Sequence, residues 1–283
     1  TGTAGLVPAF MRFGDGVNFL AGGIGREIRD ALYADRSNDA YGYCIKVAEL
    51  KRLYDSMALK AGFRFSFFTH LTDIVCDCAG HIDYAVLSSK SGMFAVKAKV
   101  YIDATGDGDL CAWAGADYAL GDENGNTMPA TLCSLWAGID FEERGSVRDD
   151  SQIEQAIEDG VFSFEDRHLP GISEVDRESG IGGGNIKEYA EFTYGPGESY
   201  GIPYRALIPS RLSNALVAGR CISTDRQMQA SVRVMPGCYI TGQAAGIAAA
   251  LACDCGGDTR SVHTQTLHKS LRDLGAYLPN TTF

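Results

Sequence analysis

One segment of the chain changes character abruptly: VYIDATGDGDLCAWAGADYA, from Val100 to Ala119. Its first residues are apolar, as in a strand buried within a sheet, and an Ala-rich run typical of a helix follows the Gly-Asp-Gly turn. In an open α/β sheet, ligands lie beyond the carboxyl ends of parallel strands, where small residues let them approach the backbone. The segment predicts a parallel strand over 100–104 that is covered on both faces. Either a ligand site or a tight turn into the helix follows at 105–108.

A second segment, NALVAGR, repeats this arrangement, with buried Leu216 and Val217 followed by Ala218 and Gly219. That two strands of one chain end in this way is less easily explained by chance. Each strand end can still be explained by a turn alone.

The segment VMPGCYITGQAAGIAAALA predicts a helix that begins at Pro236 and Gly237. Small residues recur along it at helical spacing, namely Gly242, Ala245, Gly246 and Ala249. Such a stripe lets a helix pack closely on a sheet or a flat ligand, although an ordinary Ala-rich packing helix has the same composition. The free amides and the dipole at its start favour negative charge, and a reduced flavin is a chemically fitting occupant.

The remaining segments indicate a mixed α/β chain. Helices are predicted over 22–36, where Ile28 and Leu32 share a face, and over 47–61, with Gly62 as its stop. The aromatic and β-branched stretch 63–100 predicts antiparallel strands, the last of which runs into the 100–104 strand. Residues 120–200 predict a less regular layer with one strand and one helix, and the segment from Tyr200 begins with a strand.

Composition excludes several classes of function. A net charge of −11 disfavours nucleic acid or an anionic membrane as partner. The nine cysteines show no disulfide framework and no four-ligand metal spacing, so we expect no metal and reduced thiols in a cytoplasmic protein. The longest apolar stretch, 244–253, is shorter than the ~20 residues that span a bilayer. A small-molecule substrate is expected, and the oligomeric state stays open.

These segments, in this order, resemble the FAD-dependent oxidoreductases of the two-dinucleotide-binding, glutathione-reductase-like flavoprotein superfamily. The motifs that carry the resemblance are VYIDATGDGDLCAWAGADY, IPYRALIPSRLSNALVAGRCIS and SVRVMPGCYITGQAAGIAAALA. The opening TGTAGLVPAFMRFGDGVNFLAGGIGREI and the closing LHKSLRDLGAYLP are similar too, so the resemblance covers most of the chain.

The resemblance implies FAD as the cofactor and places a set of residues beside it. These are Thr3, Ala4, Ala104, Thr105, Gly106, Asp107, Gly219, Arg220, Met235, Pro236, Gly237, Thr241 and Gly242. Arg220 stands where the wider superfamily commonly has an Asp that holds a ribityl hydroxyl. An Arg suits a phosphate better, which leaves the ribityl contact unassigned.

The resemblance also implies segments that this sequence does not contain. The family begins with a βαβ unit whose G-x-G-x-x-G turn cradles the pyrophosphate, and this unit would precede Thr1. A longer helical region is expected around 186–194. The expected domains are 1–120, the first part of the FAD-binding domain with the meander 63–100; 121–200, a substrate or cap region; 201–262, the rest of the FAD-binding domain; and 263–283, a C-terminal helix and tail.

Three residues are candidates for the chemistry of the substrate: Arg233, His168 and Asn185. Arg233 suits a substrate carboxylate, although a salt bridge within its loop is an equal alternative. His168 suits an acid or base, and Asn185 lies in the Gly-rich stretch 182–185. Arg205 is a further cation expected near the flavin.

The sequence therefore predicts a Rossmann-like, three-layer α/β domain with a meander and a smaller α+β domain. Its predicted function is hydride transfer between flavin and a small organic substrate. The alternative is a non-catalytic binding or scaffold protein that keeps the fold without the cofactor. An NAD(P)-dependent dehydrogenase is weaker, because no second glycine fingerprint is present.

Overall fold

The computed structural model describes residues 9–33, 43–121 and 195–279, with a few isolated residues between 125 and 161. The chain divides into two compact units, one made of 1–118 and 194–283 and the other of 119–193. All elements treated below belong to the first unit. Most of the strand and helix predicted within 120–200 lies outside the described residues.

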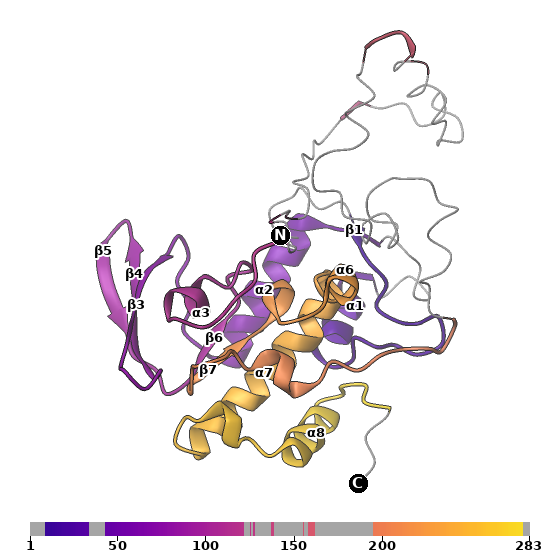
Figure 1. Ribbon diagram of the computed structural model, residues 1–283. Coiled ribbons are helices and arrows are strands. Elements are labelled where there is room, and N and C mark those ends of the chain that lie inside the picture. Colours follow the sequence, from indigo (N-terminus) through magenta and orange to yellow (C-terminus); the bar gives the residue numbers. More distant parts are fainter. Residues whose placement is uncertain are drawn as a thin grey trace. The chain divides into compact units, whose positions relative to one another are not determined.

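Helices and three small sheets alternate along the described chain (Figure 1). In chain order the elements are β1 (Ala9–Phe10), α1 (Ile24–Tyr33), β2 (Tyr43–Cys44), α2 (Val47–Ala61), β3 (His70–Cys76), β4 (Ile82–Ser89), β5 (Gly92–Val96), β6 (Tyr101–Asp103), α3 (Asp109–Trp113), η4 (Tyr204–Leu207), β7 (Ala215–Val217), η5 (Gly219–Cys221), α6 (Arg226–Val232), α7 (Met235–Asp254), η6 (Thr259–Ser261) and α8 (Thr264–Asp273). The η elements are short 3₁₀ helices. The predicted α/β composition is thereby confirmed for this part of the chain.

The two predicted N-terminal helices are present, and the end of α2 follows the sequence rule for helix stops. Gly62 has φ 72° and donates its N–H to the carbonyls of Ala58 and Leu59, closing the last turn. A left-handed residue at this place costs least when it is glycine. Leu50 and Ala58 are buried on the inner face of α2.

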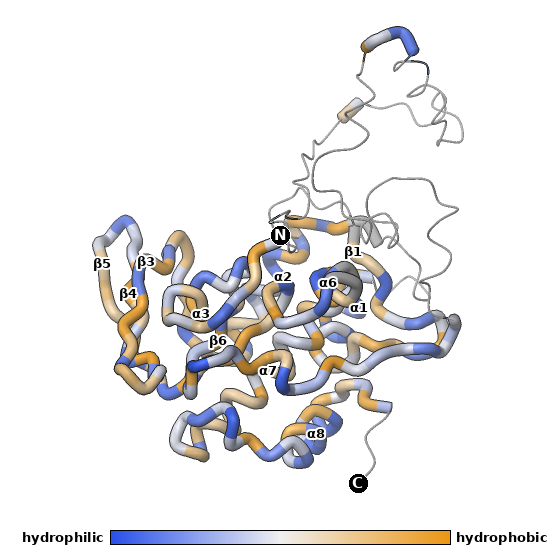
Figure 2. The backbone as a smooth tube through the Cα atoms, in the orientation of Figure 1, coloured by the Kyte–Doolittle hydropathy of each residue, from blue (hydrophilic) through white to orange (hydrophobic). Residues whose placement is uncertain are grey.

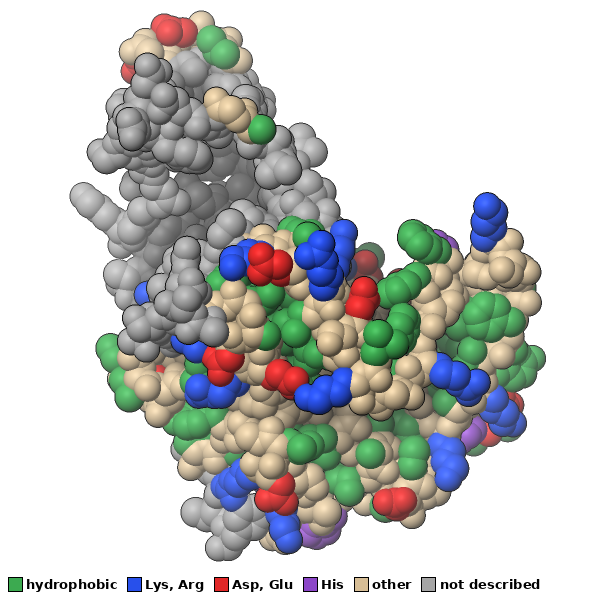
Figure 3. All heavy atoms as spheres, turned by 180° about the vertical axis from the view of Figure 1, so that it is seen from behind, with side chains coloured by type: hydrophobic (Ala, Val, Ile, Leu, Met, Phe, Trp, Pro, Cys, Tyr) green, Lys and Arg blue, Asp and Glu red, His purple; other side chains and the backbone are tan. Residues whose placement is uncertain are grey.

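β3, β4 and β5 form the predicted antiparallel meander, but it is shorter than expected at both ends. β3 begins only at His70, opposite Ser88, because β4 ends one residue later and offers no further partner. The preceding run of phenylalanines is therefore not a strand. Its rings contact one another and are exposed, as are other hydrophobic side chains scattered over the surface (Figure 3).

The prediction of one continuous strand from the meander into 100–104 is wrong. The hydroxyl of Tyr101 accepts a hydrogen bond from Ala98 N–H at 3.0 Å and lies 3.2 Å from the carbonyl of Val96. These contacts fold residues 97–100 back around the Tyr101 ring, which is buried. The chain consequently leaves the meander after β5 and enters a different sheet at β6.

β6 and β7 pair in parallel, as predicted, with Tyr101 opposite Ala215 and Asp103 opposite Val217. β7 is buried throughout, whereas Ile102 in β6 is 38% exposed. The prediction that β6 is covered on both faces is therefore wrong within the described chain. The prediction of a strand after Tyr200 is also wrong, because this segment forms the 3₁₀ helix η4.

α7 is the central element of the described fold, since it packs against β6, β7, α1, α6, α8 and all three 3₁₀ helices. It is apolar on every side, unlike α8, in which hydrophobic and hydrophilic residues alternate (Figure 2). Such a helix has no single stripe to fix its rotation. The face buried against the sheet is Thr241, Ala245, Ala248 and Ala252.

Of the predicted packing stripe on α7, Ala245 is buried in the core and Ala249 packs against it, whereas the two glycines pack on nothing within the described chain. Gly242 and Gly246 are exposed, and a Cβ built on either would meet nothing within 4 Å. The rotation follows from Thr241, whose buried hydroxyl accepts a hydrogen bond from the Gly219 N–H after β7.

The first core is largely aliphatic and includes Leu216 of β7, Ala245 and Ala248 of α7 and Leu267 of α8. A second, aromatic core lies where α1, α2 and the N-terminal turns of α7 meet. Phe10 packs on Phe13 with ring centroids 5.4 Å apart, and Phe13 stacks on Tyr239 at 6.4 Å. The hydroxyls of Tyr239 and Tyr54 are 2.7 Å apart. Burial raises the pKa of both phenols, so the pair stays protonated and joins α2 to α7.

Candidate functional site

The site predicted at the two strand ends is assembled by the parallel pairing of β6 and β7. Asp103 and Val217 are the last residues of the two strands, and the N–H of Ala218 donates to the carbonyl of Asp103 at 2.9 Å. The loops that follow therefore start side by side at one edge of the sheet. This is the edge at which open α/β sheets bind ligands.

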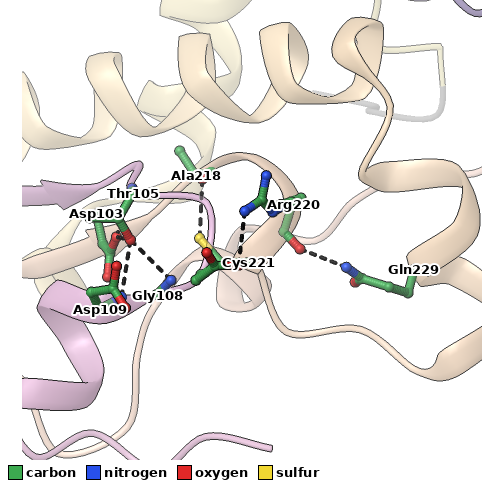
Figure 4. Close-up of polar contacts among 9 residues, drawn as sticks. Asp103, Thr105, Gly108, Asp109, Ala218, Arg220, Cys221 and Gln229 are labelled. Atoms are coloured by element: carbon green, nitrogen blue, oxygen red, sulfur yellow. Dashed lines mark hydrogen bonds and ion pairs between the residues drawn. The ribbon is translucent and has the colours of Figure 1, made fainter. Parts of the chain in front are cut away.

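The loop after β6 is held by the buried carboxylate of Asp103. Its Oδ1 accepts from the N–H and the hydroxyl of Thr105 at 3.0 and 2.8 Å, and its Oδ2 accepts from Cys111 N–H at 2.9 Å. The Thr105 hydroxyl oxygen in turn accepts from the N–H groups of Gly108 and Asp109 (Figure 4). The side chains of Asp103 and Thr105 thus accept hydrogen bonds from the backbone N–H groups of the turn into α3. Ala104 and Asp107 remain exposed.

The loop after β7 is held by residues that are distant in sequence. Gly219, with φ 84°, donates its N–H to the Thr241 hydroxyl at 3.0 Å. The side chain of Gln229, from α6, donates to the carbonyl of Arg220 at 2.7 Å and accepts from the hydroxyl of Thr224. The backbone of η5 is thereby fixed between α6 and α7, while the Arg220 side chain projects away from it.

The Arg220 side chain connects the two loops (Figure 4). Its guanidinium contacts the carboxylate of Asp107 at 2.8 Å, across the ends of both strands. A Cβ built on Gly106, whose φ is 89°, would lie 2.9 Å from the guanidinium carbon. Glycine at this position lets the cation lie flat against the loop backbone.

The start of α7 adds backbone donors. The residue before the helix, Val234, makes no side-chain capping bond, and Pro236 occupies the first turn. Proline is favoured there because it lacks the N–H that would have no partner in the helix. The first intrahelical bond runs from Cys238 N–H to the Val234 carbonyl, so the positive end of the helix dipole lies at Met235–Gly237.

Three thiols surround the strand ends, and the pKa of each is raised, chiefly by burial. For Cys111 and Cys221 the neighbouring carboxylate of Asp103 raises the pKa further. For Cys238 the cation of Arg220 opposes the effect of burial. These cysteines are neutral at pH 7, and all seven cysteines whose side chains the structure describes are free thiols.

The structure brings together most of the residues predicted beside FAD. Two of that set, Thr3 and Ala4, lie outside the described residues, and so do His168 and Asn185, two of the candidates for the substrate chemistry. Ala104, Thr105, Gly106 and Asp107 form the loop after β6, Gly219 and Arg220 follow β7, and Met235 to Gly242 begin α7. Thr241 is buried, with its hydroxyl used inside the fold, whereas Gly242 is exposed.

The predicted cations near the flavin lie on different elements. Arg233 follows α6 directly, and its carbonyl accepts from the Cys238 thiol at 3.3 Å, next to the start of α7. Arg205 lies exposed in η4. Their roles toward a substrate stay predictions.

Sequence reasoning missed two residues that shape the site. Asp103 carries a local signal, because an Asp at a strand end with Thr two residues later is typical of a side-chain-capped turn. Gln229 carries no such signal, because it bonds to the backbone carbonyl of Arg220, which lies on another element.

Within the described part of the chain, no three His, Cys, Asp or Glu side chains gather as metal ligands would. Nor does any of its helices combine the length and apolarity needed to cross a membrane.

Comparison with known proteins identifies the family. The chain matches the family described as FAD dependent oxidoreductase over residues 1–181 and 172–271, which together cover most of its length. No curated protein and no solved structure matches significantly. The protein is a member of the FAD dependent oxidoreductase family, an enzyme that uses FAD as its cofactor.

Proposed function

We propose that this enzyme oxidises or reduces a small organic molecule by hydride transfer to or from FAD, which is held where β6, β7 and α7 converge. The observation that carries this proposal is the pair of adjacent strand ends with Arg220 between them. A cationic side chain next to glycines that bring the backbone close is suited to a diphosphate. The family assignment supplies the cofactor.

The residues present fit FAD by their chemistry. Gly106 and Gly219 both have positive φ, which favours glycine, and neither presents a Cβ to a ligand at its strand end. The Arg220 guanidinium offers a planar fork for phosphate oxygens. The first turn of α7 offers partial positive charge to the flavin ring. Arg220, Gly219, Gly106 and Met235–Gly237 are the residues that we propose to hold the cofactor.

The proposal extends to the architecture. We place the described unit in the glutathione-reductase-like superfamily, as a Rossmann-like three-layer domain. The parallel pair β6–β7 with α7 packed on it supports this. A βαβ unit with a glycine-rich turn, as the resemblance implies, would complete the diphosphate site. Residues 121–200 would supply a substrate or cap region.

FAD, when bound, supplies the acceptor or donor of the hydride. The chain's own contribution is electrostatic and positional. The start of α7 stabilises negative charge that develops on the ring. The Tyr54–Tyr239 pair keeps its protons, because burial raises the pKa of both phenols, and it fixes the first turn of α7. Arg233 is proposed to bind a substrate carboxylate, and His168 and Asn185 to move or stabilise a proton.

The family assignment favours an enzyme over the alternative of a scaffold that has lost its cofactor. Free thiols at the described cysteines accord with the proposal of a cytoplasmic protein. The net charge of −11 accords with a small-molecule partner in place of nucleic acid or membrane.

Anaerobic spectroscopy of the protein expressed from its complete gene tests this proposal. The oxidised flavin is expected to absorb at about 370 and 450 nm. A panel of alcohols, amines and hydroxy acids is added first, and bleaching identifies the oxidised substrate class. The dithionite-reduced enzyme is then offered enones and imines, and returning absorbance identifies a reductase. Deuteration of the hydrogen that the substrate transfers should slow the bleaching of the flavin by the active substrate. No reaction in either direction contradicts the proposed oxidation or reduction of these substrate classes.

A further inference from the structure

The ion pair between Arg220 and Asp107 links two loops that are otherwise held independently. Asp107 belongs to the loop fixed by Asp103 and Thr105, and Arg220 to the loop fixed by Thr241 and Gln229. Neither residue is needed to satisfy the backbone of its own loop. The pair is therefore free to open without disturbing either strand end.

Arg220 is held at its backbone, whereas its side chain is partly exposed. The side-chain amide of Gln229 donates to the carbonyl of Arg220 at 2.7 Å. The N–H of the preceding residue, Gly219, donates to the Thr241 hydroxyl at 3.0 Å. The side chain itself is 40% exposed and lies over Gly106, where no Cβ intervenes. Rotation about the side-chain bonds is enough to turn the guanidinium from the Asp107 carboxylate toward a ligand beside the same loop.

Asp107 is a weak partner for this cation. Its side chain is 73% exposed, and it meets the guanidinium through one contact of 2.8 Å. Exposed ion pairs of this kind are screened by water and contribute at most about 1 kcal/mol. A phosphate group carries more acceptor oxygens than a single carboxylate contact uses and can engage both arms of the guanidinium. It would therefore replace Asp107 at little cost.

From this placement we propose that Asp107 is an internal counter-ion that takes the place of a cofactor phosphate at Arg220 and is displaced when FAD binds. The inference rests on the proposed position of the cofactor phosphates at the two strand ends. In a chain of net charge −11, such a counter-ion keeps the cation in place above Gly106 before binding. The same carboxylate lowers the affinity for the diphosphate, because its charge competes for Arg220.

The proposal predicts opposite effects of the two partners. Asp107→Asn frees the guanidinium, so FAD should bind about three- to tenfold more tightly at low ionic strength, and the gain should shrink as salt screens the charges. Arg220→Gln removes the cation, so FAD should bind about tenfold or more weakly. Riboflavin has no phosphate, so its affinity should change little in either variant.

Fluorescence titration of the full-length protein, stripped of its cofactor, measures these affinities. FAD and riboflavin are compared in the wild type, Asp107→Asn and Arg220→Gln, each at about 20 and 200 mM salt. Asp117→Asn is the matched control, because Asp117 makes an exposed ion pair of 2.7 Å with Arg211, in the loop that leads into β7. Inorganic pyrophosphate alone should raise the melting temperature of the wild type. The increase should be larger for Asp107→Asn, and Arg220→Gln should show none.

The outcomes separate this inference from the proposal on which it rests. If Arg220→Gln binds FAD as the wild type does, the phosphates do not lie at the strand ends, and both fail. If Arg220→Gln weakens FAD binding while Asp107→Asn has no effect, the phosphate position stands and the counter-ion role is wrong. If Asp107→Asn weakens FAD and riboflavin alike, Asp107 binds the ribityl chain, which also overturns the counter-ion role.

Discussion

The two strand ends look alike in the sequence, but the structure holds them by different means. After β6, one side chain from the strand itself, Asp103, organises the turn through Thr105 and Cys111, at most eight residues away. After β7, the backbone is held by Thr241 and Gln229, which lie on two separate helices. The first loop is a local structure, and the second exists only once α6 and α7 have packed.

The largest effect is expected from removing the local support. Asp103→Ala removes the fully buried acceptor of three donors, of which the Cys111 N–H is buried and the two of Thr105 are part-buried, so the free energy of unfolding should fall by about 2–3 kcal/mol. Urea unfolding followed by circular dichroism measures this. Asp109→Ala, in the same turn, is the control, and an equal loss there would contradict the special role of Asp103.

A smaller effect is expected at β7, where the support comes from a distance. Thr241→Val preserves the shape of the buried side chain but leaves the Gly219 N–H without its acceptor, at a cost of about 1–2 kcal/mol. Thr241→Ser retains the hydroxyl and should lose less. If the Ser and Val variants unfold at the same urea concentration, the hydroxyl does not hold this loop.

The buried thiol of Cys111, beside the β6 end, should make the free energy of unfolding depend on pH. Burial beside Asp103 raises the pKa of Cys111 above its unfolded value of about 9. The unfolded thiol therefore loses its proton first as pH rises, and the folded state loses stability above pH 9 by up to about 1.4 kcal/mol per unit. Cys111→Ala should show a flatter decline in unfolding free energy between pH 8 and 10.5. Parallel curves for the two proteins would exclude a contribution from this thiol.

The smallest effect is expected at the outer contact of the β7 loop. Gln229→Met keeps the length of the side chain but removes the bond to the Arg220 carbonyl, which is only partly buried, so about 1 kcal/mol is lost. Gln265→Met, at an exposed position of α8, is the comparison variant. A melting temperature equal to that of Gln265→Met would show that α6 contributes packing alone.

The same difference explains what could be predicted from the sequence. The stop of α2 at Gly62 and the parallel strands before each glycine turn depend on short-range rules, and both are confirmed. The break between β5 and β6 and the rotation of α7 were missed. Each is set by one hydroxyl, of Tyr101 or of Thr241, that bonds to backbone outside its own element.

The candidate site follows the same division. The loop 104–107 and the segment 219–220 were both expected along the FAD, and the pairing of β6 with β7 brings their starts together. The bridging of Arg220 to Asp107 was not expected, because no spacing rule relates residues 113 positions apart. The predicted roles of Thr3, Ala4, His168 and Asn185 fall outside the described residues and stay predictions.

The position of α7 between an aliphatic and an aromatic core has a consequence for how the protein opens. Its Ala245 and Ala248 pack in the first core, and Tyr239 packs in the second. A helix shared in this way cannot detach without exposing both cores, so its central amides should exchange with solvent deuterium only through global unfolding. Amides in the β3–β5 meander, which makes few contacts with the other elements, should exchange through smaller and more frequent openings.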